Sequence, residues 1–110
     1  MAIQVILQQA GPLPIRATFP APGDGPMYLV VHGSVWSQSP NVIIGIAVDL
    51  EGQKVGEARI FSNGAATHRP VVPAYIPVKL SPGPHTLTLS ASTTQTVSDY
   101  NDFYTVALHY

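Results

Sequence analysis

The densest group of hard-oxygen ligands in the sequence lies near its end, in residues 98–102 (Ser-Asp-Tyr-Asn-Asp). Asp99, Asn101 and Asp102 offer carboxylate and amide oxygens, the donors that calcium prefers. The same side chains also suit a turn in which Asp and Asn accept hydrogen bonds from backbone N–H groups, with Asp102 starting the strand that follows. The sequence leaves both interpretations open, calcium ligands or a capped turn.

Two other segments carry residues suited to a hydroxyl-rich ligand. Trp36, the only tryptophan, is followed by a polar stretch that contains Gln38 and Asn41. An indole can stack on a sugar face while amides bond to its hydroxyls, although Trp36 would equally close one end of a core. His68 and Arg69 form an adjacent pair that suits a carboxylate or hydroxyl-rich ligand, in a loop that could also be a mobile surface turn. We therefore predict a ligand site from these five residues.

Catalytic and transition-metal chemistry find little support. The four histidines are scattered, and no His-x-His or His-Glu spacing gives two ligands from one element. Residues 33–36 (Gly-Ser-Val-Trp) lack a nucleophile elbow, and no pair among the six acids stands apart in an apolar context. With no cysteine, disulfides and thiolate sites are excluded. We predict a protein that is not an enzyme and has no cofactor other than, at most, calcium.

The elements that must position these residues are β-strands. Eleven prolines and nine glycines divide the 110 residues into short β-rich runs, and no window has a helical period. Strands are predicted over residues 2–8, 15–19, 27–36, 42–50, 55–61, 74–80, 85–91 and 103–109. A hairpin connection is predicted at residues 51–54, with Gly52 supplying positive φ. We predict one domain over residues 1–110, an all-β, eight-stranded antiparallel sandwich of jelly-roll topology.

Alternation along the strands indicates which faces are buried. Residues 76–80 and 86–90 alternate apolar with polar or proline positions, as in sheets that are wet on one side. Residues 27–36 and 103–109 carry apolar or aromatic groups on both faces. Such strands are central in a sheet, or their outer face meets another subunit.

The charge content points the same way. Charged residues make up 10% of the chain and hydrophobic residues 45%, with a formal net charge of -1, so part of the surface is expected to meet a partner. The five Lys and Arg residues form no basic stripe, which argues against nucleic acid. The N-terminus does not resemble a secretory signal, and no run approaches the ~20 apolar residues of a membrane span. We expect a soluble protein whose compartment the sequence leaves open.

The order of turns and strands resembles that of small bacterial tumour-necrosis-factor-like jelly rolls. The resemblance rests on the short strands, on residues 81–89 (Ser-Pro-Gly-Pro-His-Thr-Leu-Thr-Leu), and on Asp-Tyr-Asn-Asp at 99–102 leading into a last strand. It implies a compact homotrimer that packs through aromatic sheet faces and holds ligands at subunit junctions. By this resemblance Tyr104, Tyr110 and His109, and Trp36 with them, would lie at the oligomer interface. The same aromatic residues also suit ordinary core or surface positions.

Residues 98–102 are also similar to the Asp-rich loop of the two-calcium fucose- and mannose-binding bacterial lectins. That resemblance implies that Asp99, Asn101 and Asp102 bind calcium and that sugar hydroxyls complete the coordination. This chain has Val97 where those lectins carry a further acid, and Tyr110 where they end in glycine. Asp99 and Asp102 alone bring little charge for two calcium ions.

These features predict a non-enzymatic, self-associating jelly-roll module, lectin-like in binding carbohydrate or another cell-surface ligand. A trimer is the expected oligomer. The alternative is a structural or assembly protein, such as a virion, phage or appendage component, that has no small-molecule ligand. A small hydrolase or metal-dependent enzyme is the third alternative.

Overall fold

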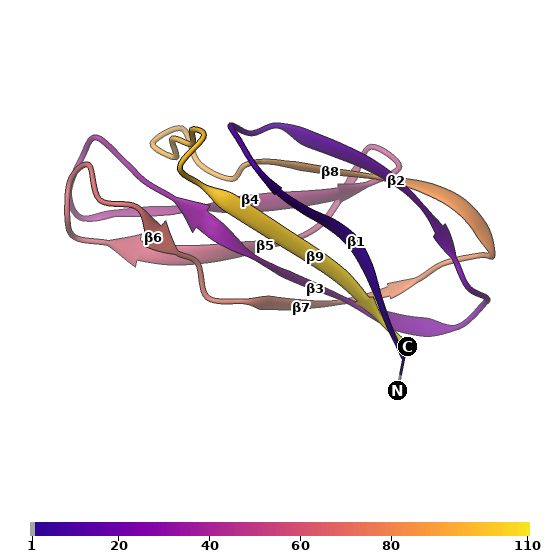
Figure 1. Ribbon diagram of the computed structural model, residues 1–110. Helices are drawn as coiled ribbons and strands as arrows, with labels where there is room; N and C mark the ends of the chain where they lie inside the picture. The colour runs from indigo at the N-terminus through magenta and orange to yellow at the C-terminus, as the bar shows by residue number, and fades with distance from the viewer. Residues whose placement is uncertain (1) are drawn as a thin grey trace.

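The computed structural model describes residues 2–110 as two antiparallel β-sheets packed face to face (Figure 1). The strands are β1 (Ile3–Ala10), β2 (Ile15–Ala21), β3 (Pro26–Val35), β4 (Val42–Leu50), β5 (Gln53–Ser62), β6 (Arg69–Pro70), β7 (Ala74–Lys79), β8 (Gly83–Ala91) and β9 (Phe103–His109). Between residues 2 and 110 no helix is long and apolar enough to cross a membrane.

Each sheet brings together strands from distant parts of the chain. One sheet has the order β1-β9-β3, and the far edge of β3 pairs first with β7 and then with the short β6. The other sheet has the order β2-β8-β4-β5. This interleaving is that of a jelly roll. The two chain ends lie side by side, because Ala2 and Tyr110 exchange backbone hydrogen bonds of 2.7 and 3.0 Å beside the β1–β9 pair (Figure 1).

The predicted all-β sandwich is confirmed, and β4 and β9 have the bounds that alternation predicted. Residues 2–110 form nine strands rather than eight because Arg69–Pro70 pairs with the end of β3 as a short additional strand. The predicted hairpin connection is a two-residue turn between the paired residues Leu50 and Gln53. Both of its residues have positive φ, 52° at Glu51 and 81° at Gly52.

The core consists of the side chains that each strand turns toward the opposite sheet. Ile44 and Ile46 of β4 have no exposed surface, and neither have Tyr104, Val106 and Leu108 of β9. Burying an aliphatic or aromatic side chain of this size stabilises a fold by about 1.5–3 kcal/mol. The last strand is therefore central to the fold, as its apolar sequence predicted.

Tyr104 packs against a glycine in the neighbouring strand. Gly33 of β3 is its cross-strand partner, and a Cβ at Gly33 would lie 2.6 Å from Cδ1 of Tyr104. A larger residue at position 33 would have to displace the ring, so glycine is required there by space. Tyr104 thus lies wholly inside one chain, which corrects its predicted place at an oligomer interface.

The outer face of the β1-β9-β3-β7 sheet carries two apolar rows that cross the strands. Strand pairing aligns the first row, and a second row lies two residues further along. The first row is Ile3, His109, Tyr28 and Pro77, and the second is Val5, Ala107, Val30 and Tyr75. Ile3 is 61% exposed and Tyr75 67%. Neither row contains an acidic residue, a lysine or an arginine, so this face is an apolar surface in contact with solvent.

The buried hydroxyl of Tyr104 predicts a pH-dependent stability. Burial raises the pKa of Tyr104 from 10.0 to about 12; a weak interaction with Ser98 opposes the rise, and the carboxylates of Asp102 and Asp99 add to it. The folded state binds this proton more tightly than the unfolded state does. The contribution of the proton to the free energy of unfolding is therefore fully present below pH 10 and is lost as the pH rises toward 12. We expect the free energy of unfolding to fall over this range by about 2–3 kcal/mol more than in Tyr104→Phe.

Guanidinium unfolding at a series of pH values measures this difference. At neutral pH the Tyr104→Phe variant should be at least as stable as the native protein, because the hydroxyl is buried without a hydrogen bond of good geometry. Equal pH slopes for the two proteins would contradict the assignment.

Candidate functional site

Three loops meet at one end of the sandwich, where β3 ends and β4 and β9 begin (Figure 1). They are residues 36–41, residues 63–68 and residues 92–102. Trp36 and Val97 exchange backbone hydrogen bonds of 2.9 and 2.8 Å, which fix the third loop to the end of β3. The backbone N–H of Ala66 donates to the carbonyl of Ser37 at 2.7 Å and so joins the second loop to the first.

The carboxylate of Asp102 lies at the centre of this end and has no exposed surface. Its Oδ1 accepts a hydrogen bond from Ser34 Oγ at 2.8 Å and lies 2.7 Å from Nδ1 of His68. Its Oδ2 accepts the backbone N–H of Asp99 at 2.9 Å. A buried carboxylate with this many donors stabilises the fold only while all of them are present. Asp102 therefore holds β3, the second loop and the third loop together.

His68 is positioned between two carboxylates. Nδ1 of His68 lies 2.7 Å from Oδ1 of Asp102, while Nε2 lies 3.8 Å from Oδ2 of Asp99. The imidazole packs against the indole of Trp36, with ring centroids 5.7 Å apart and planes inclined by 38°. One suitable atom from each of His68, Asp99 and Asp102 lies within 4.8 Å of the others.

The loop of the predicted calcium ligands is a capped turn. Oδ1 of Asp99 accepts the backbone N–H of Asn101 at 2.8 Å, and Asp102 stands immediately before β9. Asn101 is exposed, and the structure brings His68 close to the two acids. The sequence gives no signal for this partner, because His68 lies 34 residues from Asp102.

A polar groove of about 290 Å³ opens beside these loops. Its lining residues are Ser37, Gln38, Ser39, Thr94, Gln95 and Val97. Gln38 and Gln95 are exposed, and the hydroxyl of Thr94 donates to Oε1 of Gln95 at 3.2 Å, which leaves the amide N–H groups of Gln95 free to donate. The groove thus presents amides and hydroxyls, with no charged side chain among its lining residues.

The five predicted ligand residues lie around this end but do not form one site. Gln38 lines the groove, whereas Trp36 is half-buried beneath the loops against His68. Asn41 is exposed in a left-handed conformation before β4, with φ of 56°. Arg69, the first residue of β6, donates through Nη2 to Oδ1 of Asn63 in the second loop at 3.2 Å.

Sequence reasoning missed part of the groove. Thr94 and Gln95 form its second wall, but a Thr-rich stretch without acids or aromatics has no motif that marks a site. Of the predicted interface residues, Tyr110 is 44% exposed and His109 lies in the first apolar row. Both residues lie at the C-terminal end of β9, whereas the three loops lie near the N-terminal end of that strand.

Comparisons with known proteins show which fold this is. No protein-family model and no curated protein sequence matches the chain. A native family 35 carbohydrate-binding module from Clostridium thermocellum superposes with a TM-score of 0.56 at 16% identity, over 91% of this chain and 72% of that module. The C-terminal domain of the sugar-binding protein EclA gives 0.51 at 14% identity, over 98% and 77%. Dimeric latent PorU from Porphyromonas gingivalis gives 0.60 at 10% identity, over 97% of this chain but only 12% of PorU.

The chain has the jelly-roll β-sandwich fold. At these identities the likeness extends to the fold alone, so the function is argued from the site.

Replacing Asp102 should unfold this end of the molecule. Asp102→Ala removes the shared acceptor of Ser34, of His68 and of the backbone N–H of Asp99 from a site without exposed surface, and we expect the free energy of unfolding to fall by about 3 kcal/mol. Chemical denaturation followed by tryptophan fluorescence reports the change directly, since Trp36 packs on His68. The matched control, Asp24→Ala in an exposed loop, should change stability by no more than about 0.5 kcal/mol. Similar losses in both variants would show that Asp102 is not the link.

Proposed function

We propose that this chain is a non-catalytic carbohydrate-binding module and that the groove between residues 37–39 and 94–97 is its saccharide site. The lining of the groove carries the proposal: the exposed amides of Gln38 and Gln95 and the exposed hydroxyl residues Ser39 and Thr94 border a space of about 290 Å³. Amides and hydroxyls both donate and accept, as sugar hydroxyls do. The sandwich fold shared with a carbohydrate-binding module and a sugar-binding domain supports it.

The groove favours a neutral saccharide bound by hydrogen bonds. None of its lining residues is charged, and none is aromatic. Residues 37–39 and residues 94–97 form the two walls of the groove. The backbone pairing of Trp36 with Val97 holds these two segments together, so the amides of Gln38 and Gln95 stand on connected segments and not on independent loops. A shallow polar site of this kind exchanges hydrogen bonds with water for hydrogen bonds with sugar, which gives modest affinity per ring.

The buried polar cluster supports binding rather than catalysis. In a hydrolytic triad the serine faces the histidine, and the histidine faces the acid. Here Ser34 and His68 both bond to the same oxygen of Asp102, and Nε2 of His68 faces Asp99 instead of a hydroxyl. We propose that this cluster braces the loops and does no chemistry.

The same cluster fits calcium poorly. Calcium takes several oxygen ligands, whereas Asp102 already accepts three hydrogen bonds from the protein and the third neighbour is an imidazole. Oδ1 of Asp99 also accepts a backbone N–H, so only its Oδ2 is free of such bonds. We therefore propose saccharide binding that does not depend on calcium.

We infer that the module self-associates through the two apolar rows on the outer face of the β1-β9-β3-β7 sheet. Four of the row residues, Ile3, Val5, Tyr28 and Tyr75, are each at least 50% exposed. An apolar surface that crosses four strands without a charge is typical of a subunit contact. A trimer is the state we expect, and the predicted interface residue His109 lies within the first row.

The same face supports the second candidate function, that of an assembly protein without a ligand. The two candidates differ in whether the groove binds sugar, and not in whether the chain associates. A defined oligomer that binds no glycan would favour assembly over recognition.

Glycan binding should depend on the two groove amides. We expect Gln38→Ala and Gln95→Ala each to weaken binding of a hit from a glycan array about tenfold, the loss of roughly one hydrogen-bonding group. Titration calorimetry, with and without a calcium chelator, gives the affinities. Gln9→Ala, an exposed glutamine on β1, is the matched control and should bind normally. Unchanged affinity in both groove variants would remove the groove as the site, and loss of binding in chelator would restore calcium.

Self-association should depend on the apolar rows. Tyr75→Lys places a charge at the β7 end of the second apolar row, within the proposed contact, and should convert the oligomer to a monomer, as measured by light scattering coupled to size exclusion. Phe61→Lys is the matched control, because Phe61 is 59% exposed on the other sheet. A native protein that is already monomeric, or an oligomer that persists in Tyr75→Lys, would overturn the proposed contact.

A further inference from the structure

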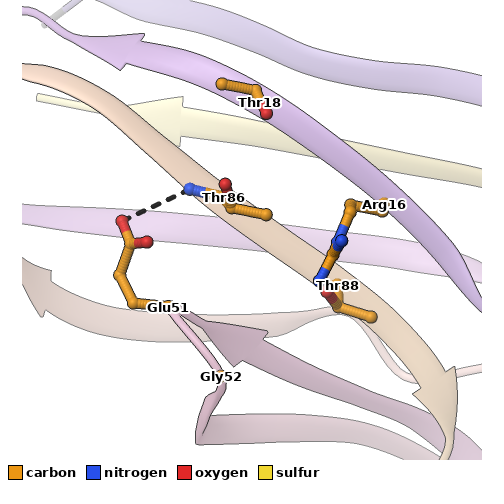
Figure 2. Close-up of a pocket in the computed structure, with 6 residues that line it drawn as sticks. All are labelled: Arg16, Thr18, Glu51, Gly52, Thr86 and Thr88. Atoms are coloured by element: carbon orange, nitrogen blue, oxygen red, sulfur yellow. Dashed lines mark hydrogen bonds between the residues drawn. The ribbon is translucent and has the colours of Figure 1, made fainter.

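A second hollow lies on the outer face of the β2-β8-β4-β5 sheet, beside the turn that joins β4 to β5. Its volume is about 470 Å³. It is lined by Arg16, Thr18, Glu51, Gly52, Thr86 and Thr88 (Figure 2). It stands at the end of β4, whereas the groove described above lies next to the loop that precedes β4. Nine strand residues separate the two places, roughly 25–30 Å along the sheet.

The floor of the hollow is a group of hydroxyls that strand pairing holds together. Thr18 pairs with Thr86 across β2 and β8, and Arg16 pairs with Thr88 in the same ladder. Figure 2 shows these side chains on one face of the two strands. In the described part of the chain no side-chain or backbone group bonds to the three threonine hydroxyls, and Arg16 has no carboxylate partner. Three hydroxyls and a guanidinium are therefore free to bind a ligand.

Glu51 forms the opposite wall, and its backbone is strained. Both residues of its turn have positive φ, a conformation that favours Asn, Asp or Gly at the first position. A glutamate there is unusual, and unfavourable backbone conformations are often found at functional sites. Its carboxylate is held in place, because Oε1 accepts the backbone N–H of Thr86 at 3.3 Å (Figure 2) and also lies 2.7 Å from Nδ1 of His85. Oε2 has no partner within residues 2–110.

His85 is itself fixed, so the wall is rigid. Its Nε2 lies 2.7 Å from the carbonyl oxygen of Ser81, and its ring packs on Phe19 with centroids 6.0 Å apart. The imidazole is 13% exposed. A glutamate braced by a nearly buried histidine keeps its free oxygen in one position, which is what a binding site requires.

We propose that this hollow is a second saccharide site, which takes a neutral sugar by its ring hydroxyls, a proposal that rests on the saccharide-binding function proposed above. Arg16 and Glu51 bring one positive and one negative side chain to the lining, and strand pairing places Asp49 and Lys54 in the row of Thr88. The charges around the hollow therefore balance, and an uncharged ligand fits better than an ion. Free hydroxyls, a guanidinium and a carboxylate oxygen supply both donors and acceptors. No aromatic ring lines the hollow, so the sugar binds by its edge and not by stacking.

Two sites at opposite ends of one strand would let a module bind two sugars at once. Each is weak alone, but an extended glycan or a surface dense in glycans would engage both, and the second contact would form at high effective concentration. The oligomer proposed above would multiply this effect.

Amide proton–nitrogen correlation spectra separate the two sites in one experiment. The probes are the methyl glycosides of glucose, galactose, mannose and xylose, each titrated to millimolar excess. We expect one glycoside or more to shift amides of residues 16–18, 51–52 and 86–88 as well as those of residues 37–39 and 94–97. Thr86→Val, which keeps shape and loses the hydroxyl, should weaken the first set of shifts about fivefold to tenfold and leave the second set unchanged. Thr105→Val, on the outer face of the other sheet, is the matched control.

The outcomes are distinct. Shifts in both sets, with the first set sensitive to Thr86→Val, support the second site. Shifts in the first set alone support it too and overturn the groove. Shifts confined to residues 37–39 and 94–97 overturn the second site while the proposed function stands. Shifts in neither set overturn both the second site and the proposed saccharide-binding function. Arg16→Gln gives an independent check that shifts at residues 16–18, 51–52 and 86–88 arise from binding in the hollow.

Discussion

The buried carboxylate of Asp102 is the interaction on which the loop end of the molecule depends. It receives donors from β3, from the loop before β6 and from its own turn, while its backbone carbonyl accepts the N–H of Gly11 at 3.1 Å. A charge without exposed surface is tolerated only when it is fully hydrogen-bonded. The position of residues 99–102 relative to β3 and to the second loop therefore follows from this buried carboxylate.

The sandwich could be predicted because its strands and turns leave patterns within short stretches of sequence. Period-two alternation determined the bounds of β4 and β9, and the Glu-Gly pair marked the hairpin. The short β6 could not be predicted, because two residues in a polar loop carry no period and pair only when β3 offers a free edge. Tyr104 was predicted at an oligomer interface by the resemblance to tumour-necrosis-factor-like jelly rolls. Its burial depends on the space above Gly33, which only the strand register reveals.

The sequence predicted where the candidate site lies better than it predicted which residues form it. The sequence pointed to residues 36–41, 68–69 and 99–102, and folding brings these segments to one end of the sandwich. The roles differ, because Asp102 bonds to His68 and to the backbone N–H of Asp99, and a pair 34 residues apart has no spacing to detect. The turns and hydrophobics that resembled tumour-necrosis-factor-like proteins are shared by jelly rolls in general, so they identified an architecture and not a relative.

The paired chain ends have a mechanical consequence. Ala2 and Tyr110 hydrogen-bond to each other at the open end of the antiparallel β1–β9 pair, so a tension applied through both ends pulls these strands apart like a zipper. The bonds then break one after another, each bearing the whole load, and β1 peels away at low force. Tension between one end and the far loops would instead load the strands along their length, with many bonds sharing it. The same module would thus be weak or strong according to the two points at which it is held.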